Sequence, residues 1–294
     1  METSELLKKV RKIEIKTRAL SKNIFAGQYH SAFKGKGMAF SEVREYQFGD
    51  DIRSIDWNVT ARFNHPFIKV FEEERELTVM LLVDVSGSGF FGTQKQLKKD
   101  LMTEIAAVIS FSAIQNNDKI GVILFSDKVE KFIPPKKGRQ HILRIIRELI
   151  EFEPSSTQTN ISEALRYLTN AIKKKSTAFL LSDFIDYNHS KACVNFEEAL
   201  RIANRKHDVV ALRILDIREK NMPSLGLVKM YDAELATEQW VDTSDPKTRQ
   251  NFLYWWNGFE NRLSDSFKKS MVDNALIYTG EDFVKPLTKL FKKR

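Results

Sequence analysis

A carboxylate and two hydroxyls follow one another at alternate positions where an apolar run of the sequence ends. Residues 79–83 are all apolar, and Asp84, Ser86 and Ser88 come directly after them. In a loop that curves round one point, alternate side chains can be directed to the same place. Carboxylate and hydroxyl oxygens form a donor set that suits Mg²⁺, Mn²⁺ or Ca²⁺, whereas zinc prefers His and Cys. The first hypothesis is therefore a site for a hard divalent cation.

Two more oxygen-bearing side chains stand at positions that can complete such a site. Thr159 lies in a cap-rich loop before a predicted helix, and Asp183 follows a predicted strand over 177–182. In parallel sheets, ligands bind at the carboxyl ends of the strands, near the point where the strand order reverses. We therefore expect both residues to join the loop of Asp84. Mg²⁺, with Mn²⁺ or Ca²⁺ as alternatives, would keep a free position for a carboxylate from another molecule.

A nucleophile or a helix cap could also account for the residues of this loop. A serine nucleophile is disfavoured, because neither Ser86 nor Ser88 has the Gly-x-Ser-x-Gly flanks of a hydrolase elbow. An aspartyl nucleophile at Asp84 would need an acid two residues on, where Ser86 stands, although Asp183 and Asp186 keep that alternative open. In the structural alternative, Ser86 and Ser88 cap a helix that begins near residue 93, and Asp84 forms a turn.

Apolar strands alternate with amphipathic helices from residue 77 onward, which predicts the elements that position these side chains. The expected class is α/β, with a doubly wound, mostly parallel, Rossmann-type sheet flanked by helices. Strands are predicted at 78–83, 119–125, 128–135, 177–182, 208–215, 226–232, 237–242 and 275–279. Helices are predicted at 93–116, 138–152, 161–175, 191–206, 246–270 and 282–292.

Two segments before this alternation have a different character. Residues 1–24 are interpreted as an amphipathic N-terminal helix, residues 25–76 as a small β-rich segment, and residues 77–294 as the main domain. The β-rich segment offers a possible partner surface, because exposed Trp and Arg often anchor interfaces. Its members are Asp50, Arg53, Asp56, Trp57 and Arg62. A second metal site at Asp50, Asp51 and Asp56 is the alternative, and a charge-paired turn is the simplest interpretation.

Composition restricts the class of protein. The chain has 294 residues, of which 42% are hydrophobic and 29% charged. Its apolar runs are far shorter than the roughly 20 residues of a membrane span, and it has a single cysteine, Cys193. A cytoplasmic protein without a membrane span is expected. The net charge of +8 allows nucleic-acid binding, but the basic clusters near the two ends lack interleaved aromatic residues.

Three short segments resemble the metal-ion-dependent adhesion site (MIDAS) of von Willebrand factor type A domains. They are DVSGS (84–88), TNI (159–161) and SDF (182–184). The resemblance implies a helix-wrapped parallel sheet and a divalent cation to which a partner adds an acidic ligand. The implied ligands, direct or through water, are Asp84, Ser86, Ser88, Thr159 and Asp183. Asn160 stands where relatives more often have Asp, which lowers the negative charge near the metal.

Longer segments resemble the DUF58 family of bacterial proteins. They are FSEVREYQFGDDIRSIDWNVTAR (40–62), VFEEERE (70–76) and IPPKKGR (133–139). The resemblance extends from about residue 35 to the end and implies the soluble short form of the family. It also implies association with a MoxR-type AAA+ ATPase in a chaperone-like or assembly role.

The sequence thus predicts a non-enzymatic adaptor that uses a MIDAS-like cation to bind an acidic residue of a protein partner. The expected partner is a MoxR-type AAA+ ATPase or its client. The first alternative is a metal-dependent phosphatase or phosphotransferase with Asp84 as the nucleophile. The second is a basic nucleic-acid-binding module.

Overall fold

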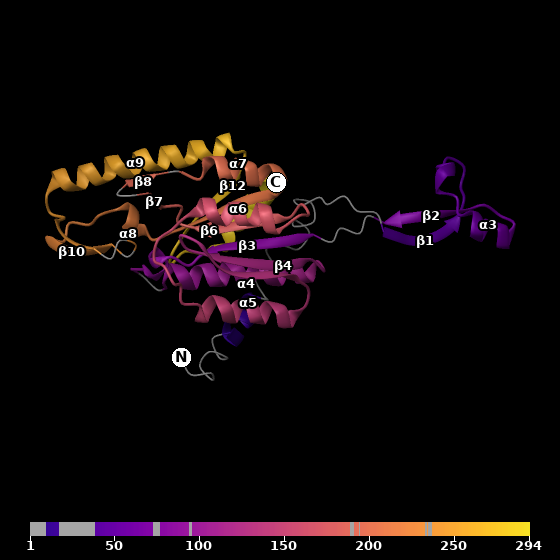
Figure 1. The fold of residues 1–294 in the computed structure, drawn as a ribbon, viewed down its shortest axis with the longest axis horizontal. Coiled ribbons are helices and arrows are strands. Elements are labelled where there is room, and N and C mark those ends of the chain that lie inside the picture. The colour runs from indigo at the N-terminus through magenta and orange to yellow at the C-terminus, as the bar shows by residue number, and fades with distance from the viewer. Residues whose placement is uncertain are drawn as a thin grey trace. The chain divides into compact units, whose positions relative to one another are not determined.

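The computed structural model contains two compact units (Figure 1). One unit combines Met1–Ala32 with Thr78–Arg294, and the other is Phe33–Leu77. Within the described part of the chain, no helix is both long and apolar enough to span a bilayer. The residues that the structure describes are 10–17, 39–72, 77–93, 96–188, 191–193, 195–232, 234 and 237–294.

A six-stranded sheet forms the centre of the first unit, in the order β12-β9-β6-β3-β4-β5. Its strands are β3 (Thr78–Asp84), β4 (Lys119–Phe125), β5 (Val129–Lys136), β6 (Thr177–Ser182), β9 (Asp208–Leu215) and β12 (Asp273–Tyr278). Neighbouring strands are parallel except for β4 and β5. The chain builds β4 and β5 on one side of β3 and then builds β6, β9 and β12 on the other. The predicted doubly wound α/β fold is confirmed, and its strand order reverses between β3 and β6.

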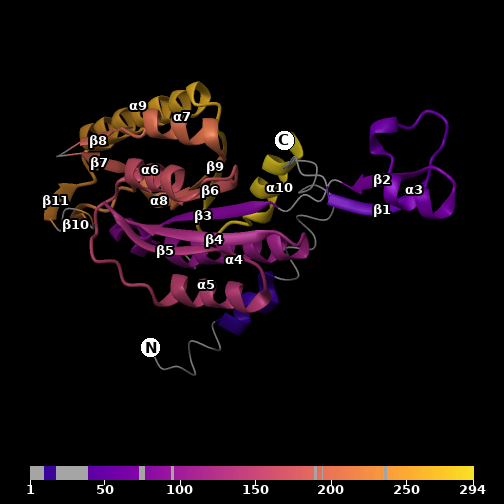
Figure 2. The same cartoon turned by 45° about the vertical axis from the view of Figure 1, so that its right-hand side comes forward.

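Helices cover both faces of this sheet, which explains why its central strands are apolar throughout. Met80 and Leu82 of β3 face a core shared with α6, α7 and α9, and Val79, Leu81 and Val83 are buried on the opposite face. Figures 1 and 2 show α6, α7 and α9 on one side of the sheet and α4 and α5 on the other. The helices are α4 (Lys98–Gln115), α5 (Arg139–Glu151), α6 (Ile161–Ala171), α7 (Glu197–Lys206), α8 (Ile217–Lys220), α9 (Pro246–Lys269) and α10 (Val284–Lys293).

The antiparallel strand β5 closes one edge of the sheet. It contains Pro134 and Pro135, neither of which has a backbone N–H to donate. The pairing of β4 with β5 shifts register between Ile120 and Val122. At Gly121, in this shift, a Cβ would lie only 2.9 Å from the carbonyl oxygen of Ile133. Glycine therefore allows the two strands to approach closely around the prolines.

Two predicted helices begin later than the sequence suggested. Helix α4 begins at Lys98 rather than near 93, and a short 3₁₀ turn, η2 (Gly87–Phe90), precedes it. Helix α7 begins at Glu197 rather than 191, because residues 191–193 form β8 (Lys191–Cys193). Strand β8 pairs with β7 (Asp186–Asn188) in a small hairpin. Backbone pairing across a short turn thus replaces the first part of the predicted helix.

The last third of the chain adds a second hairpin and the long helix α9. Strands β10 (Leu227–Asp232) and β11 (Thr237–Asp242) are antiparallel, as predicted. Among the aromatic residues of α9, Trp256 and Phe259 are buried, whereas Tyr254 is 85% exposed.

Residues 10–17 form a helix that docks on the first unit. Glu14 forms an ion pair with Arg139 of α5 at 2.5 Å, and Lys16 forms one with Glu104 of α4 at 2.7 Å. Val10 and Thr17 are buried, so the apolar stripe packs within the same chain. The rest of the predicted N-terminal helix over 1–24 lies outside the described residues.

The second unit is built on an antiparallel pair of strands, β1 (Ala39–Glu45) and β2 (Phe67–Glu72). Between them lie the 3₁₀ turn η1 (Ile52–Ser54) and the helix α3 (Trp57–Phe63). Asp51 caps η1 and Asp56 caps α3, each through a side-chain oxygen that accepts backbone N–H groups. The predicted β-rich segment at 25–76 therefore contains helical turns between its two strands.

Candidate metal centre

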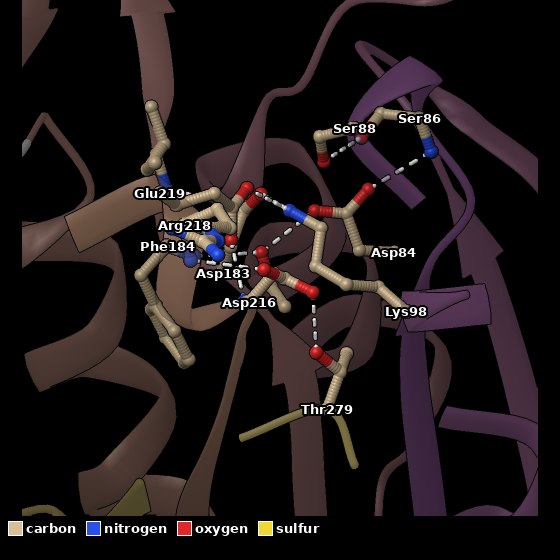
Figure 3. Close-up of polar contacts among 12 residues, drawn as sticks. Asp84, Ser86, Ser88, Lys98, Asp183, Phe184, Asp216, Arg218, Glu219 and Thr279 are labelled. Atoms are coloured by element: carbon tan, nitrogen blue, oxygen red, sulfur yellow. Dashed lines mark hydrogen bonds and ion pairs between the residues drawn. The ribbon is translucent and has the colours of Figure 1, made fainter. Parts of the chain in front are cut away.

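The candidate site lies at the carboxyl ends of the two strands between which the strand order reverses. Asp84 is the last residue of β3, and Asp183 directly follows β6. Strands β3 and β6 are hydrogen-bonded neighbours, so their carboxyl ends meet at the same edge. Figure 3 shows both side chains in one polar cluster. The topology thus brings together two carboxylates that are distant in the sequence.

The loop after β3 holds Asp84 by both of its carboxylate oxygens. The backbone N–H of Ser86 donates to Oδ1 at 3.0 Å, and the Ser182 hydroxyl donates to Oδ2 at 2.6 Å. The hydroxyls of Ser86 and Ser88 lie 3.2 Å apart. Ser86 makes no side-chain cap on the turn that follows it, and α4 begins ten residues after Ser88, so the prediction that the two serines cap this helix is wrong. Asp84 does stabilise a turn, because it accepts the N–H of Ser86. The three alternate side chains are instead directed into one cluster.

A second loop lies against the first and contacts the end of β4 through the N–H of Asn160, which donates to the carbonyl oxygen of Ser126 at 2.9 Å. The backbone N–H of Gly87 donates to the carbonyl oxygen of Thr157 at 2.9 Å, and Thr159 is buried. Asn160 caps α6 through its side chain, which accepts the N–H of Glu163. Asn160 is therefore engaged in a helix cap. The cap fixes Thr159 at the start of the helix.

A fully buried lysine, Lys98, accompanies Asp183. Its Nζ lies 2.8 Å from Oδ2 of Asp183 and 2.5 Å from Oε1 of Glu219. Figure 3 shows the ammonium directed at both carboxylates. Burial alone would lower the pKa of Lys98, but the two carboxylates raise it well above its usual value. Lys98 is therefore a permanent charge within the cluster, introduced by the first turn of α4.

Asp183 is held by several groups besides Lys98. Burial raises its pKa, but Lys98, the N–H of Ile185 and the Ser88 hydroxyl together bring the pKa below its usual value. The next residue, Phe184, has a left-handed backbone with φ of 62°, which is unfavourable for a bulky side chain. Its ring packs edge-on against Phe267. Tertiary packing thus maintains the turn that directs Asp183 inward.

Asp216 anchors Glu219, the second partner of Lys98. It directly follows β9 and caps α8, and the two residues form a reciprocal capping box. The hydroxyls of Thr93 and Thr279 both donate to Asp216 at 2.6 Å. Burial is outweighed by these hydrogen bonds, which lower the pKa of Asp216 to about 2. Asp216 was not among the predicted site residues, although it follows a strand as Asp183 does.

Three other carboxylates of the cluster have raised pKa values. Burial and the charge of Asp183 raise the pKa of Asp84 to about 6, despite hydrogen bonds from Ser182 and Ser86. Burial, with a smaller contribution from Asp84, raises the pKa of Asp186 to about 6. Burial and the charges of Asp183 and Asp84 raise the pKa of Glu234 to about 8, despite a hydrogen bond from Thr159. The cluster has an excess of buried carboxylates.

This donor set fits a hard divalent cation. The five predicted ligands provide only oxygen atoms, and the excess of negative charge is what such a cation neutralises. Among the described residues, no three or more His, Cys, Asp and Glu side chains form a metal-binding group. A cation here would therefore depend on the hydroxyls of Ser86, Ser88 and Thr159 as well as on the two aspartates.

The predicted partner surface is in the other unit. Asp50 accepts two hydrogen bonds from Arg44, at 2.7 and 2.9 Å, and Asp56 caps α3. Trp57 is 68% exposed, and Arg53 and Arg62 are also exposed. Since Asp50, Asp51 and Asp56 are each engaged locally and belong to no metal-binding group among the described residues, the structure gives no support to a second metal site.

The fold is a doubly wound α/β sheet with a cluster of oxygen donors at its reversal point. Solved von Willebrand factor A domains, from SpRpn10 and from Catenulispora acidiphila, are among its structural matches, each at 11% identity and with TM-scores of 0.37 and 0.36. The chain belongs to the family described as "Protein of unknown function DUF58", whose model matches residues 42–255. The predicted family is therefore confirmed.

Relatives and solved structures match much of this chain. The uncharacterized protein Rv1480 of Mycobacterium tuberculosis is 29% identical over 245 residues, which cover 83% of this chain and 75% of the relative. The conserved hypothetical protein BatB from Bacteroides thetaiotaomicron is similar over 74% of this chain and 98% of its own, at 15% identity and a TM-score of 0.48. A mussel byssus matrix protein, solved with a zinc-occupied MIDAS motif, matches 47% of this chain and 38% of its own at 17% identity and a TM-score of 0.36.

Proposed function

We propose that this protein is a non-enzymatic adaptor that binds an acidic residue of a protein partner through a divalent cation. Mg²⁺ is the proposed cation, with Mn²⁺ or Ca²⁺ as alternatives. The observation that carries the proposal is the convergence of three distant segments on one cluster of oxygen donors at the reversal point of the sheet. The residues that would hold the cation are Asp84, Ser86, Ser88, Thr159 and Asp183.

The surrounding contacts support binding rather than a chemical reaction. When bound, the cation supplies an electrophilic centre for a carboxylate oxygen. Asp84 is oriented by Ser86 and Ser182, and Asp183 by Lys98 and Ile185. The hydrogen-bond partners described for the five residues include no histidine or cysteine. The acid two residues after Asp84 that an aspartyl phosphatase would need is a serine, Ser86.

The resemblance to the DUF58 family supports a more specific partner. We propose a MoxR-type AAA+ ATPase, or a client of such an ATPase, with the protein acting in chaperone-like assembly. The cation would bind an aspartate or glutamate of that partner. The exposed Trp57 with Arg53 and Arg62 in the second unit would add a further contact.

A binding experiment with a purified MoxR-type ATPase from the same genome tests the proposal. The wild-type protein should bind the ATPase in the presence of Mg²⁺ and dissociate from it when EDTA is added. Asp84→Asn and Asp183→Asn should weaken binding at least tenfold, since each removes a charged oxygen donor. Asp265→Asn, on the exposed side of α9, is the matched control and should bind as wild type does. Circular dichroism confirms that the variants are folded.

The same variants distinguish the enzymatic alternative. Binding that is indifferent to EDTA and to Asp84→Asn would contradict the adaptor. Turnover of phosphoesters by the wild type, lost in Asp84→Asn, would assign the site to a phosphatase instead. A nucleic-acid-binding module would show affinity that falls steeply with salt and does not respond to EDTA.

A further inference from the structure

A carboxylate of the protein itself reaches the candidate metal centre. Glu234 lies in the connection between β10 and β11 and is buried. The hydroxyl of Thr159, one of the proposed metal ligands, donates to its Oε1 at 2.9 Å. An acidic side chain therefore already occupies the side of the cluster where Thr159 stands.

The backbone around Glu234 is fixed by two hydrogen bonds. Its N–H donates to Oδ1 of Asp232 at 2.9 Å, and its carbonyl oxygen accepts from the Thr157 hydroxyl at 3.1 Å. The second bond comes from the same loop that contains Thr159. Glu234 is thus held on this loop through its backbone carbonyl, and its carboxylate is left to reach Thr159.

The carboxylate is poorly satisfied by the described protein groups alone. Its Oε2 is buried, and no described residue offers it a hydrogen-bond partner. The same carboxylate experiences the negative charges of Asp183 and Asp84. A buried carboxylate oxygen without a partner, among like charges, is costly unless something compensates for it. A cation among these oxygens would provide that compensation.

We propose that Glu234 is an internal acidic ligand of this metal centre, taking the position that a partner's carboxylate would fill. The inference rests on the proposed cation site and identifies which group completes it in the free protein. A partner's acidic residue then binds by replacing Glu234, so the β10–β11 connection sets how readily the centre accepts a partner.

Titration with Mn²⁺, followed by calorimetry, tests this inference in the full chain. Glu234→Ala should weaken Mn²⁺ binding by about tenfold, a typical loss for one metal-supporting group. Added acetate should restore much of that loss, because a free carboxylate fills the position of the missing one. Acetate should have little effect on the Mn²⁺ affinity of the wild type. Glu238→Ala, which removes an exposed carboxylate from β11 of the same hairpin, should bind Mn²⁺ as the wild type does.

Further variants separate the possible failures. Glu234→Gln keeps the size of the side chain and its bond to Thr159, so it should also bind Mn²⁺ more weakly than wild type. Equal affinity in wild type, Glu234→Gln and Glu234→Ala would overturn the inference, as would a loss that acetate does not restore. The proposed cation site would survive either result if Asp84→Asn still abolished Mn²⁺ binding. If Asp84→Asn bound Mn²⁺ with the affinity of the wild type, the proposed cation site itself would be contradicted.

Discussion

The aspartates of the two units differ in burial and in where their hydrogen-bond partners come from. In the first unit, Asp84 and Asp183 are 4% and 1% exposed, and each combines a backbone N–H two residues on with a side chain from a distant part of the chain, Ser182 or Lys98. In the second unit, Asp50 is bound by Arg44, six residues away, and Asp56 by the N–H groups of Asn58 and Val59 and by Lys69 of β2. The hydrogen bond from Arg44 lowers the pKa of Asp50, whereas burial raises the pKa of Asp84 to about 6. A carboxylate whose partners are nearby in the sequence stabilises a turn, whereas the sheet topology brings distant carboxylates together at the candidate site.

This difference gives a physical criterion for interpreting acidic residues. A local cap or ion pair engages the oxygens of a single carboxylate. At the reversal point of the sheet, by contrast, Asp183 and Glu219 share Lys98 within a cluster that also contains the buried carboxylates of Asp84, Asp186 and Glu234. Function is therefore expected where charge is concentrated and left uncompensated. Substitutions in the two units test this difference between their aspartates.

Replacing Lys98 by Met should give the largest loss of stability. It leaves Asp183 and Glu219 buried without their cation, which typically costs about 3–5 kcal/mol. Urea unfolding in the absence of metal measures the change. The control is Lys16→Met, which breaks a partly exposed ion pair with Glu104 and should cost less than about 1 kcal/mol. Equal effects of the two substitutions would show that the buried cluster does not depend on Lys98.

Asp84→Asn should remove the stabilisation that Mg²⁺ confers. At a Mg²⁺ concentration about 100 times its dissociation constant, a single site adds about 2.7 kcal/mol to the free energy of unfolding. The wild type should gain this and the variant should not. Unfolding curves with Mg²⁺ and with EDTA provide the measurement. A variant that responds to Mg²⁺ as the wild type does would place any cation elsewhere.

His207 should make the first unit sensitive to acid. Burial, with Lys206 nearby, lowers its pKa from 6.5 to about 4. The unfolded chain therefore binds a proton that the folded chain excludes, so stability falls as the pH drops from 6.5 toward 4. His207→Gln should make the decrease in the free energy of unfolding between pH 6.5 and 4 smaller by roughly 1–2 kcal/mol. His65→Gln, at an exposed position of the second unit, should leave the pH profile of unfolding unchanged.

Asp56→Ala should have the smallest and most local effect. It removes the cap of α3, where one carboxylate oxygen accepts from the N–H groups of Asn58 and Val59. Amide hydrogen exchange should accelerate in the first turn of α3, with and without Mg²⁺ alike. A change in the six-stranded sheet, or a dependence on Mg²⁺, would contradict the view that this aspartate, which also pairs with Lys69 of β2, acts only within the second unit.

Much of the fold was predictable because the sheet is buried on both faces. The uniformly apolar runs of β3 and β6 show both the strands and their parallel arrangement. The strand-end rule then located Asp84 and Asp183. It could also have located Asp216, which follows β9 as Asp183 follows β6.

Other members of the cluster could not be identified from the sequence. Lys98 stands beside Lys99 at the start of a helix, where a lysine is normally solvated, and only tertiary contacts bury it. Glu234 lies in a hairpin connection, and nothing nearby in the sequence indicates that it meets Thr159. Both depend on contacts between segments more than 70 residues apart.

The two prolines of β5 limit how this protein can meet another chain. Many proteins recognise extended peptides by adding them as a further strand at an open sheet edge, where backbone N–H and C=O groups pair with the newcomer. Pro134 and Pro135 of this edge strand have no backbone N–H, and the register shift beside Gly121 interrupts its regular pairing. Strand addition is therefore discouraged at this edge. Recognition is left to side chains and loops, above all where the parallel strands end.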